Sequence, residues 1–298
     1  MSSDMDIMST ISNVLNVFDF VDEIEYNKDT KVVYSGVPGA FAEMALVEFF
    51  GEDVDKIPVA SFREVMEALS NDEAAYGVLP IENSSAGNVE SNYDLLAEYD
   101  LYIVGEQIIE VNQALMVLPE ANIEDIKTVY SHPQGLMQCS KLLEEHGWHQ
   151  VSMSNTARSA MKVRDDKDIT AAAIASERSA KLYGLKIINP VANNNTNNAT
   201  RFIVLSKKPH ITAEANKVAI SFGLPHESGA LYKILGDIVN HGLNMSMIAS
   251  RPIPGKQWEY YFYIEFIGRL SDDAVKLALL EIGFHSIDLR ILGNYLTH

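Results

Sequence analysis

The sequence contains one cysteine, comparatively few basic residues and no long apolar run. A single cysteine, Cys139, cannot form a disulfide within the chain, and this favours a reducing compartment. The 23 Lys and Arg residues are outnumbered by 41 Asp and Glu residues, and the formal charge of -18 would repel nucleic acid and anionic membranes. No segment approaches the roughly 18 apolar residues of a membrane-spanning helix, and the N-terminus lacks a secretory signal pattern. We therefore expect a cytoplasmic protein without nucleic-acid or membrane partners.

Hydrophobic residues make up 47% of the 298 residues, which is enough for two or three separate cores. Residues 1–29 carry no clear chemistry, and this N-terminal extension is predicted to be an accessory helix or a disordered arm. From residue 30 to residue 209, strand patterns alternate with helix patterns, which is typical of α/β folds with largely parallel sheets. The alternation runs twice and predicts two lobes with a ligand cleft between them.

A helix is predicted over residues 134–146, where Leu136, Cys139 and Leu143 share one face, so the thiol is expected to be packed. Residues 207–216 are predicted to be a polar linker. Residues 217–298 then follow the order strand, helix, strand, strand, helix, strand, which predicts a ferredoxin-like βαββαβ domain.

The last domain has clear internal patterns. Large apolar residues alternate from Trp258 to Phe266 and predict a strand. The second helix is predicted to begin after Ser271, a good cap, and to end at Gly283.

Two segments place polar groups between a strand and a helix. The turn from Gly36 to Gly39 precedes a predicted helix whose free N–H groups would suit an anion, although glycine turns are also common in purely structural positions. His132 occupies the matching place in the second unit, before Pro133 in a first helical turn, and is by itself more typical of a structural residue.

Two further segments bring functional groups to strand ends. Residues 82–85 offer a carboxylate, an amide and two hydroxyls after an apolar strand, and their alternative role is to cap a turn. Thr200 and Arg201 follow an Asn-rich run at 193–198, so a hydroxyl and a guanidinium are expected where the cleft opens.

Five motifs in this order resemble the prephenate dehydratase family, which includes the plant arogenate dehydratases. They are Gly36-Val-Pro-Gly-Ala-Phe, Pro80-Ile-Glu-Asn-Ser, Ser131-His-Pro-Gln-Gly-Leu, Ala172-Ala-Ile-Ala-Ser and Asn198-Ala-Thr-Arg-Phe. The resemblance implies a two-lobed catalytic domain at 30–209, similar to type II periplasmic binding proteins, and an ACT regulatory domain at 217–298. It also implies decarboxylative dehydration of prephenate to phenylpyruvate, without a metal or an organic cofactor.

The resemblance implies a role for Thr200 in acid assistance, with Arg201 and Phe202 completing its motif. Phe202 would also supply an apolar wall that favours loss of the carboxylate charge, or would simply pack in a core. Ala42 stands where relatives usually have serine or threonine, so one hydroxyl contact to substrate is expected to be missing. The residues expected to bind substrate are Gly36, Gly39, Ala40, Phe41, Glu82, Asn83, Ser84, Ser85, Ser131, His132 and Gln134.

Residues 224–231 and 244–252 resemble the two phenylalanine-binding motifs of dehydratase ACT domains. Free N–H groups after Gly229 would receive the carboxylate, and Asn244 would reach the amino group across a subunit interface. Ala249 replaces the glutamate of the family pattern, which leaves the strength of regulation open. The resemblance implies a homodimer or homotetramer inhibited by L-phenylalanine. The residues expected to bind it are Leu224, Pro225, Gly229, Ala230, Leu231, Asn244, Met245, Ser250 and Arg251.

Three other functions remain open at this point. An arogenate dehydratase would run the same elimination on a substrate with an amino-acid side chain. A noncatalytic binding protein or amino-acid sensor would use the same two lobes around a cleft, although the Thr200 motif disfavours it. A catalytically dead regulatory subunit would retain only the C-terminal sensing domain.

Overall fold

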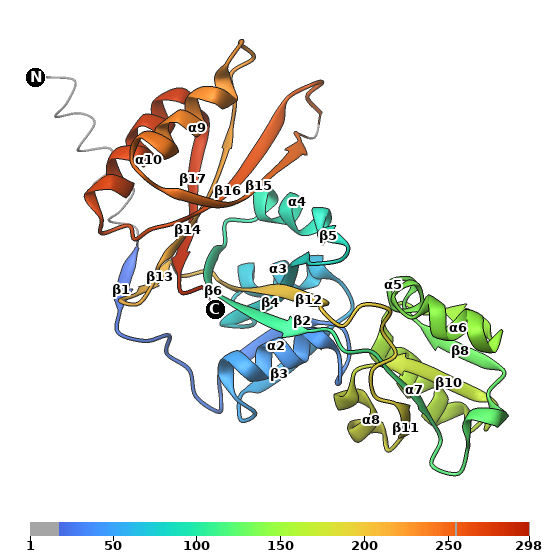
Figure 1. Ribbon diagram of the computed structural model, residues 1–298. Coiled ribbons are helices and arrows are strands. Elements are labelled where there is room, and N and C mark those ends of the chain that lie inside the picture. The colour runs from blue at the N-terminus through green and yellow to red at the C-terminus, as the bar shows by residue number, and fades with distance from the viewer. Residues whose placement is uncertain (1–17, 254, 298) are drawn as a thin grey trace, which may run out of the picture.

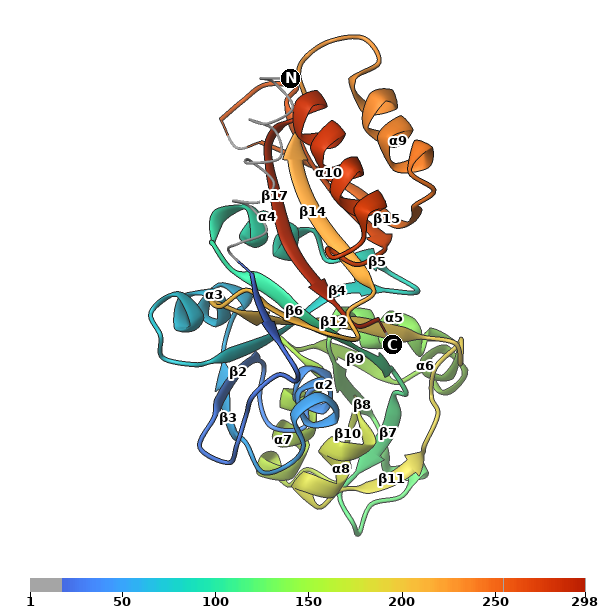
Figure 2. The same ribbon diagram turned by 90° about the vertical axis from the view of Figure 1, so that its left-hand side faces the viewer.

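The computed structural model describes residues 18–253 and 255–297, and its main sheets form three bodies (Figure 1). The first lobe lies between the second lobe and the C-terminal domain, as both views show (Figures 1 and 2). Of the N-terminal extension, residues 1–17 lie outside the described part of the chain. None of the helices in the described part has the length and apolar character that a membrane crossing needs.

The first lobe is a six-stranded sheet with the order β3-β2-β4-β12-β6 and with β5 paired to β4. Strands β2, β3 and β4 are parallel, and β12 returns antiparallel between β4 and β6. Helix α2 packs on one face, while α3 and α4 pack on the other. Its elements are β2 (Lys31–Ser35), α2 (Phe41–Phe50), β3 (Asp55–Val59), α3 (Phe62–Ser70), β4 (Tyr76–Asn83), β5 (Gly87–Asn88), α4 (Glu90–Glu98), β6 (Tyr102–Glu110) and β12 (Ala199–Ser206).

The second lobe is a five-stranded sheet with the order β11-β7-β10-β8-β9. The chain enters it through residues 111–113, between β6 and β7, and leaves it through residues 190–198, between β11 and β12. Its elements are β7 (Ala114–Val117), the 3-10 helix η1 (Ile123–Asp125), β8 (Thr128–Ser131), α5 (Pro133–Gln138), α6 (Ser140–His146), β9 (His149–Ser152), α7 (Thr156–Asp166), β10 (Ala171–Ala175), α8 (Glu177–Tyr183) and β11 (Lys186–Asn189).

The single helix predicted over 134–146 is wrong, because α5 and α6 meet at a break at Cys139. Asn194 donates hydrogen bonds to two carbonyl oxygens that would accept intrahelical N–H groups if the helix continued. Its backbone N–H donates to Gln138 O at 2.6 Å, and its side-chain Nδ2 donates to Met137 O at 3.2 Å. The packed thiol is confirmed, since Cys139 is fully buried and burial raises its pKa to about 12.

The C-terminal domain is a four-stranded sheet with the order β15-β16-β14-β17, in the βαββαβ arrangement expected. Helices α9 and α10 cover one face. The other face carries Ala219, Tyr263, Leu292 and Tyr295 into the core of the first lobe. The elements are β14 (Lys217–Gly223), α9 (Ala230–Asn240), β15 (Asn244–Pro252), β16 (Tyr260–Ile267), α10 (Asp273–His285) and β17 (Ile287–Tyr295).

Four predictions of detail for this domain and for the linker before it differ from the structure. Helix α10 continues through Gly283, which lacks the positive φ of a terminating glycine, and its N-cap is Asp272 instead of Ser271. Trp258 precedes β16 and is exposed. The expected linker contains β13 (His210–Thr212), which pairs in parallel with β1 (Asp19–Val21).

The C-terminal domain is joined to the first lobe through close backbone and side-chain contacts. A Cβ on Gly293 of β17 would lie 2.0 Å from the carbonyl oxygen of Ile103 in β6, so only glycine fits there. Arg290 donates hydrogen bonds to the carbonyls of Leu96, Tyr99 and Leu101 at the end of α4. The two domains are therefore packed backbone against backbone.

Candidate active site

A pocket of about 370 Å³ lies where the two lobes meet. The first lobe contributes residues after β2 and at the ends of β4 and β12, and the second lobe contributes the starts of α5 and α7. This is the expected position for a ligand in facing α/β units. The lining residues are Ser35, Ala40, Phe41, Ala42, Phe62, Pro80, Asn83, Val89, Val111, Gln113, His132, Gln134, Gly135, Gln138, Asn155, Thr156, Thr200 and Phe202.

Thr200 and Asn83 form the polar centre of this pocket. They are register partners on β12 and β4, and Asn83 Nδ2 donates to Thr200 Oγ1 at 2.9 Å. Asn83 is itself oriented by its Oδ1, which accepts the backbone N–H groups of Ser85 and Ala86 at 3.0 and 2.9 Å. Because the Thr200 oxygen already accepts a hydrogen bond, its O–H remains available to donate to a ligand.

His132 is the one titratable side chain among the described residues that line the pocket. None of the described residues that line the pocket is Asp, Glu, Lys or Arg. The first turn of α2 starts at the pocket, and its N-cap residue, Ala40, makes no side-chain capping bond to the free N–H groups. Asn155 and Thr156 bring the start of α7 to the same pocket. Helix N-termini carry partial positive charge, so an anion is favoured here without a cationic side chain.

His132 is a neutral member of the lining. Burial lowers the pKa of its imidazole below the ordinary value. Its Nδ1 accepts the backbone N–H of Gln134 at 3.2 Å and so caps α5. The structural role considered from the sequence is therefore present, together with a position at the pocket wall.

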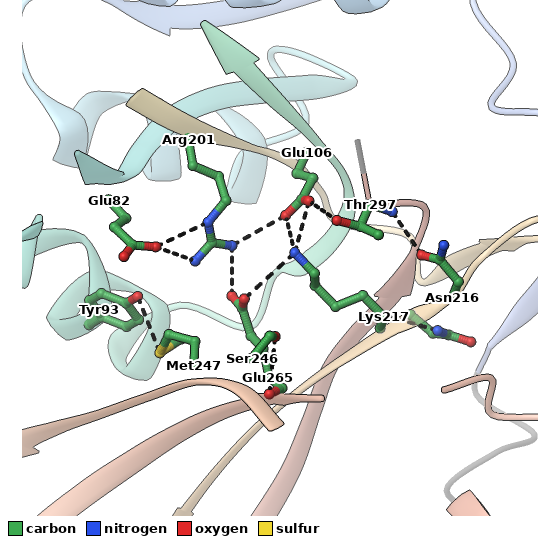
Figure 3. A network of polar contacts seen from close by, with 11 residues as sticks. Glu82, Tyr93, Glu106, Arg201, Asn216, Lys217, Ser246, Met247, Glu265 and Thr297 are labelled. Atoms are coloured by element: carbon green, nitrogen blue, oxygen red, sulfur yellow. Dashed lines mark hydrogen bonds and ion pairs between the residues drawn. The ribbon is translucent and has the colours of Figure 1, made fainter. Parts of the chain in front are cut away.

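The structure does not place the guanidinium of Arg201 in the cleft. Successive residues of a strand point to opposite faces, so Thr200 and Phe202 reach the pocket while Arg201 points to the face that meets the C-terminal domain. There it bonds Glu82 Oε2 at 3.1 Å and Glu265 Oε1 at 2.9 Å, as Figure 3 shows. Glu82, which was also expected in the cleft, lies on that far face too.

A register shift between β4 and β12 explains why Pro80 and Asn83 face the same side of the sheet. Arg201 pairs with Glu82 and Phe202 pairs with Pro80, so one extra residue, Ile81, is inserted in β4. Pro80 and Asn83 therefore both line the pocket although they are three positions apart.

The turn from Gly36 to Gly39 does not line the pocket, in contrast to the expectation. The N–H of Gly39 donates to Glu43 Oε2 at 2.6 Å, so it is not free for an anion. The carbonyl of Gly39 accepts the hydroxyls of Ser176 and Ser179, at 2.7 and 2.9 Å, both from the second lobe. The turn thus fastens one lobe to the other and positions the neighbouring residues that do line the pocket.

Arg178 strengthens the same contact between the lobes. From α8 it bonds the buried carboxylate of Glu43 at 3.1 Å and also Glu52 at 2.8 Å. We call Ser176, Arg178 and Ser179, with the turn that they hold, the interlobe clasp.

Three serines expected at the substrate lie elsewhere. Ser131 is fully buried and donates to the carbonyl of Ile174. Ser84 Oγ accepts the N–H of Ala199 and so holds the end of the Asn-rich run. Ser85 lines a smaller neighbouring pocket of about 220 Å³, together with Asn194, Asn195 and Asn198.

The pocket also contains polar residues that the sequence reasoning missed, namely Gln113, Gln138, Asn155 and Thr156. Gln113 is buried, lies in the first crossing between the lobes, and its Oε1 has no hydrogen-bond partner. Asn155 and Thr156 follow β9, which is parallel to β8. The rule that ligands bind beyond the carboxyl ends of parallel strands would have found this last pair.

A second pocket, of about 490 Å³, lies in the C-terminal domain at the start of α9. Leu224, Pro225, Gly229, Ala230 and Leu231 all line it, together with Trp258, Tyr260 and Phe262.

The other expected effector residues, Asn244, Met245, Ser250 and Arg251, lie apart from that pocket on β15, an edge strand of the sheet. Arg251 bonds Asp94 at 2.8 Å and also contacts Glu90, both in α4 of the first lobe. This guanidinium therefore links the two domains within one chain.

Comparison with known proteins places these features in a family. Residues 32–210 match the family model described as prephenate dehydratase. Arogenate dehydratase/prephenate dehydratase 2 of Arabidopsis thaliana is 33% identical over 285 residues, which cover 92% of this chain and 74% of the relative. A prephenate dehydratase from Arthrobacter aurescens, solved in complex with L-Phe, is 31% identical with a TM-score of 0.82 and covers 90% of each chain. A structure described as a quorum-quenching acylase is 28% identical with a TM-score of 0.83, over 90% of this chain and 98% of the other.

Proposed function

We propose that this chain, which belongs to the prephenate dehydratase family, converts prephenate to phenylpyruvate. In that reaction the ring carboxylate leaves as carbon dioxide, and its bonding electrons complete the aromatic ring as the hydroxyl at the opposite carbon leaves. One proton joins the leaving hydroxyl to give water, so the products are phenylpyruvate, carbon dioxide and water. The class of reaction is that of a dehydratase, a carbon–oxygen lyase.

The observation that carries this proposal is the Asn83–Thr200 pair in the interlobe pocket. Asn83 occupies a lone pair of Thr200 Oγ1 at 2.9 Å and so directs the O–H of Thr200 toward the ligand. A threonine hydroxyl is a weak acid, so its contribution is a hydrogen bond that strengthens as the leaving oxygen gains negative charge. Thr200 would therefore stabilise the departing hydroxyl without transferring a full charge to itself.

The rest of the pocket suits a dianion that must lose one carboxylate. The uncapped start of α2 offers N–H groups to a carboxylate, and Gln113, Gln134 and Gln138 add neutral amides. Phe202, with Phe41, Ala42 and Val111, makes part of the wall apolar. A carboxylate against an apolar wall is poorly solvated, which favours its departure as neutral carbon dioxide.

The second pocket supports regulation by L-phenylalanine. Its lining combines the start of α9, which suits a carboxylate, with the aromatic side chains of Tyr260 and Phe262, which suit a phenyl ring. The similar Arthrobacter protein was solved with L-Phe. Asn244 and Met245 on the exposed edge strand would contribute from a second subunit, so a homodimer or homotetramer belongs to this proposal.

The proposed catalytic domain is residues 30–209, and the proposed regulatory domain is residues 217–298. A cytoplasmic location also remains part of the proposal, supported by the single buried cysteine.

Arogenate is the second candidate substrate, because the Arabidopsis relative is named for both dehydratase activities. Similarity of fold to an acylase does not carry that activity to this chain, since function resides in the site.

The test is phenylpyruvate formation from prephenate by the purified chain, with phenylalanine formation from arogenate measured in parallel. Thr200→Ala should lower kcat by about 100-fold or more, as removal of one transition-state donor does in other sites. Thr200→Ser, which keeps the hydroxyl, is the matched control and should retain much of the rate. Turnover of neither substrate by the unaltered chain would refute the proposal and favour a sensor.

A further inference from the structure

Four buried charged side chains join the first lobe to the C-terminal sheet (Figure 3). Arg201 and Glu106 come from the first lobe, and Lys217 and Glu265 come from the C-terminal sheet. Their side chains are 11%, 0%, 8% and 4% exposed, respectively. Within these four residues two cations face two anions, which is the balance that buried charges require, and Arg201 also bonds Glu82, whose side chain is 42% exposed. We call these four residues the charge square.

The shortest contacts of the charge square run between the domains. Across the interface, Arg201 Nη1 lies 2.9 Å from Glu265 Oε1 and Lys217 Nζ lies 2.8 Å from Glu106. Within the domains, Arg201 lies 3.3 Å from Glu106 and Lys217 lies 3.9 Å from Glu265. Each charge therefore has its nearest partner on the other domain, and the square is completed only when the domains are docked.

The charge square lies next to the Asn83–Thr200 pair along the same two strands. Thr200 and Arg201 are neighbours on β12, and their register partners on β4 are Asn83 and Glu82. On the pocket face Asn83 bonds Thr200 at 2.9 Å, and on the far face Arg201 bonds Glu82 at 3.1 Å. A movement of Arg201 thus acts on the same two rungs of the sheet that set the position of the Thr200 hydroxyl.

The other side of the charge square leads to the second pocket. Lys217 begins β14, and the residue after the far end of that strand, Leu224, lines the pocket. Glu265 lies on β16, which also carries the pocket residues Tyr260 and Phe262. Two continuous strands therefore connect the second pocket to Glu265, which bonds Arg201, and to Lys217, which bonds Glu106 beside Arg201.

We propose that Arg201 is a positioning residue, which Glu265 of the C-terminal domain holds directly and Lys217 holds through Glu106, so that Thr200 donates its hydrogen bond in the reactive direction. This inference rests on the proposed function for its kinetic readout. It assigns Arg201 no contact with substrate, and it makes full activity depend on the docked C-terminal sheet. It also gives L-phenylalanine a defined physical connection to the hydroxyl at the centre of the first pocket.

The decisive variant is Glu265→Gln, which removes one charge and keeps the shape of the side chain. We expect kcat for prephenate to fall about tenfold, which is less than the roughly 100-fold that a 1 Å misplacement of a reacting group can cost. KM should stay within twofold, because no member of the charge square lines the pocket. The ratio of rates without and with saturating L-phenylalanine should also move toward one.

Arg290→Gln is the matched control, because Arg290 also joins the two domains but bonds the end of α4 instead of the strands that carry Thr200. It should lower thermal stability without the change in kcat. In the Thr200→Ala background, Glu265→Gln should have no further effect on the residual rate, because both changes act through one hydroxyl. Equal fold-losses in both backgrounds would overturn the proposal.

Glu265→Gln leaves the square with an excess positive charge and could prevent folding. The double variant Glu265→Gln with Lys217→Met restores the balance, since Arg201 and Glu106 remain as one ion pair. It should show the same loss in kcat as the single variant. If the folded double variant has unaltered kcat and unaltered sensitivity to L-phenylalanine, Arg201 is not held in this way.

A crystal structure of the double variant gives a readout that does not depend on turnover. We expect Arg201 to turn toward Glu82 and the Asn83–Thr200 distance to lengthen beyond hydrogen-bonding range. If the unaltered chain shows no activity, the proposed function fails while this distance still decides the positioning role. An unchanged distance of 2.9 Å in the variant would refute the positioning role.

Discussion

Substituting Gly293 by alanine would insert one methyl group where two domains touch backbone to backbone. The new Cβ would lie 2.0 Å from the carbonyl oxygen of Ile103 and 2.9 Å from its carbonyl carbon. Real Cβ atoms essentially never approach closer than 3.0 Å, so the gap must widen from 2.0 Å by at least 1.0 Å. No flexible side chain lies between the two strands at this point to absorb that change, because the contact is with backbone atoms.

Overpacking of this kind costs about 1 to 3 kcal/mol, and a domain of this size loses about 2 to 4 °C in Tm per kcal/mol. We therefore expect Gly293→Ala to unfold about 2 to 12 °C below the parent chain, as measured by calorimetry. Because Glu106 follows Ile103 on β6, the displacement should also stretch its 2.8 Å contact with Lys217. Activity and sensitivity to L-phenylalanine should fall together with stability.

Gly283→Ala in α10 is the matched control within the same domain. Its Cβ would meet Leu289 at 3.6 Å, an ordinary contact, and alanine in a helix interior is favoured over glycine by about 0.5 to 1 kcal/mol. This variant should therefore melt at or slightly above the parent temperature. If Gly293→Ala and Gly283→Ala had the same Tm and the same kinetics, the close docking of β17 on β6 would be refuted.

Two further predictions concern the catalytic lobes. Gly39→Ala would add a Cβ 2.7 Å from Ser179 Oγ at a φ of +90°, so both Tm and kcat/KM should fall; Gly147→Ala, at a φ of +65° with open space around it, controls for backbone strain alone. For His132, the folded pKa is lowered by burial, so the chain folds best with the neutral ring: its contribution to stability is complete above a pH of about 6.5 and declines as the pH falls below that value. Unfolding measured between pH 5 and pH 8 should show this decline, and His132→Asn, which keeps a capping acceptor, should flatten it; a parent profile as flat as that of the variant would count against the buried neutral ring.

The fold class followed from periodicity and element order, and the position of Thr200 at the cleft followed from its place at the start of a strand. The family resemblance placed Asn83 in the cleft, whereas its hydrogen bond to Thr200 is seen only in the structure. Placing Arg201 beside Thr200 in the cleft was an avoidable error, since neighbours on a strand face opposite sides of the sheet. The partner of Arg201 on the other side was not foreseeable, because Glu265 belongs to another domain and no local pattern pairs it with β12. The same limit applies to the helix break at Cys139, which depends on Asn194 and not on the residues of the helix itself.

The two segments that connect the lobes, residues 111–113 and 190–198, are hydrogen-bonded to one another. Asn193 bonds both Val111 and Gln113, at 2.7 and 2.6 Å, while Val111 also bonds Asn198 at 2.7 Å. The two segments thus form one short ribbon, and a rotation of one lobe against the other would pivot on it. Val111 and Gln113 also line the first pocket, so a substrate bound there would lie against the same connecting segments. Opening the lobes about this ribbon would break the contacts of the interlobe clasp, because those contacts join the two lobes away from the ribbon.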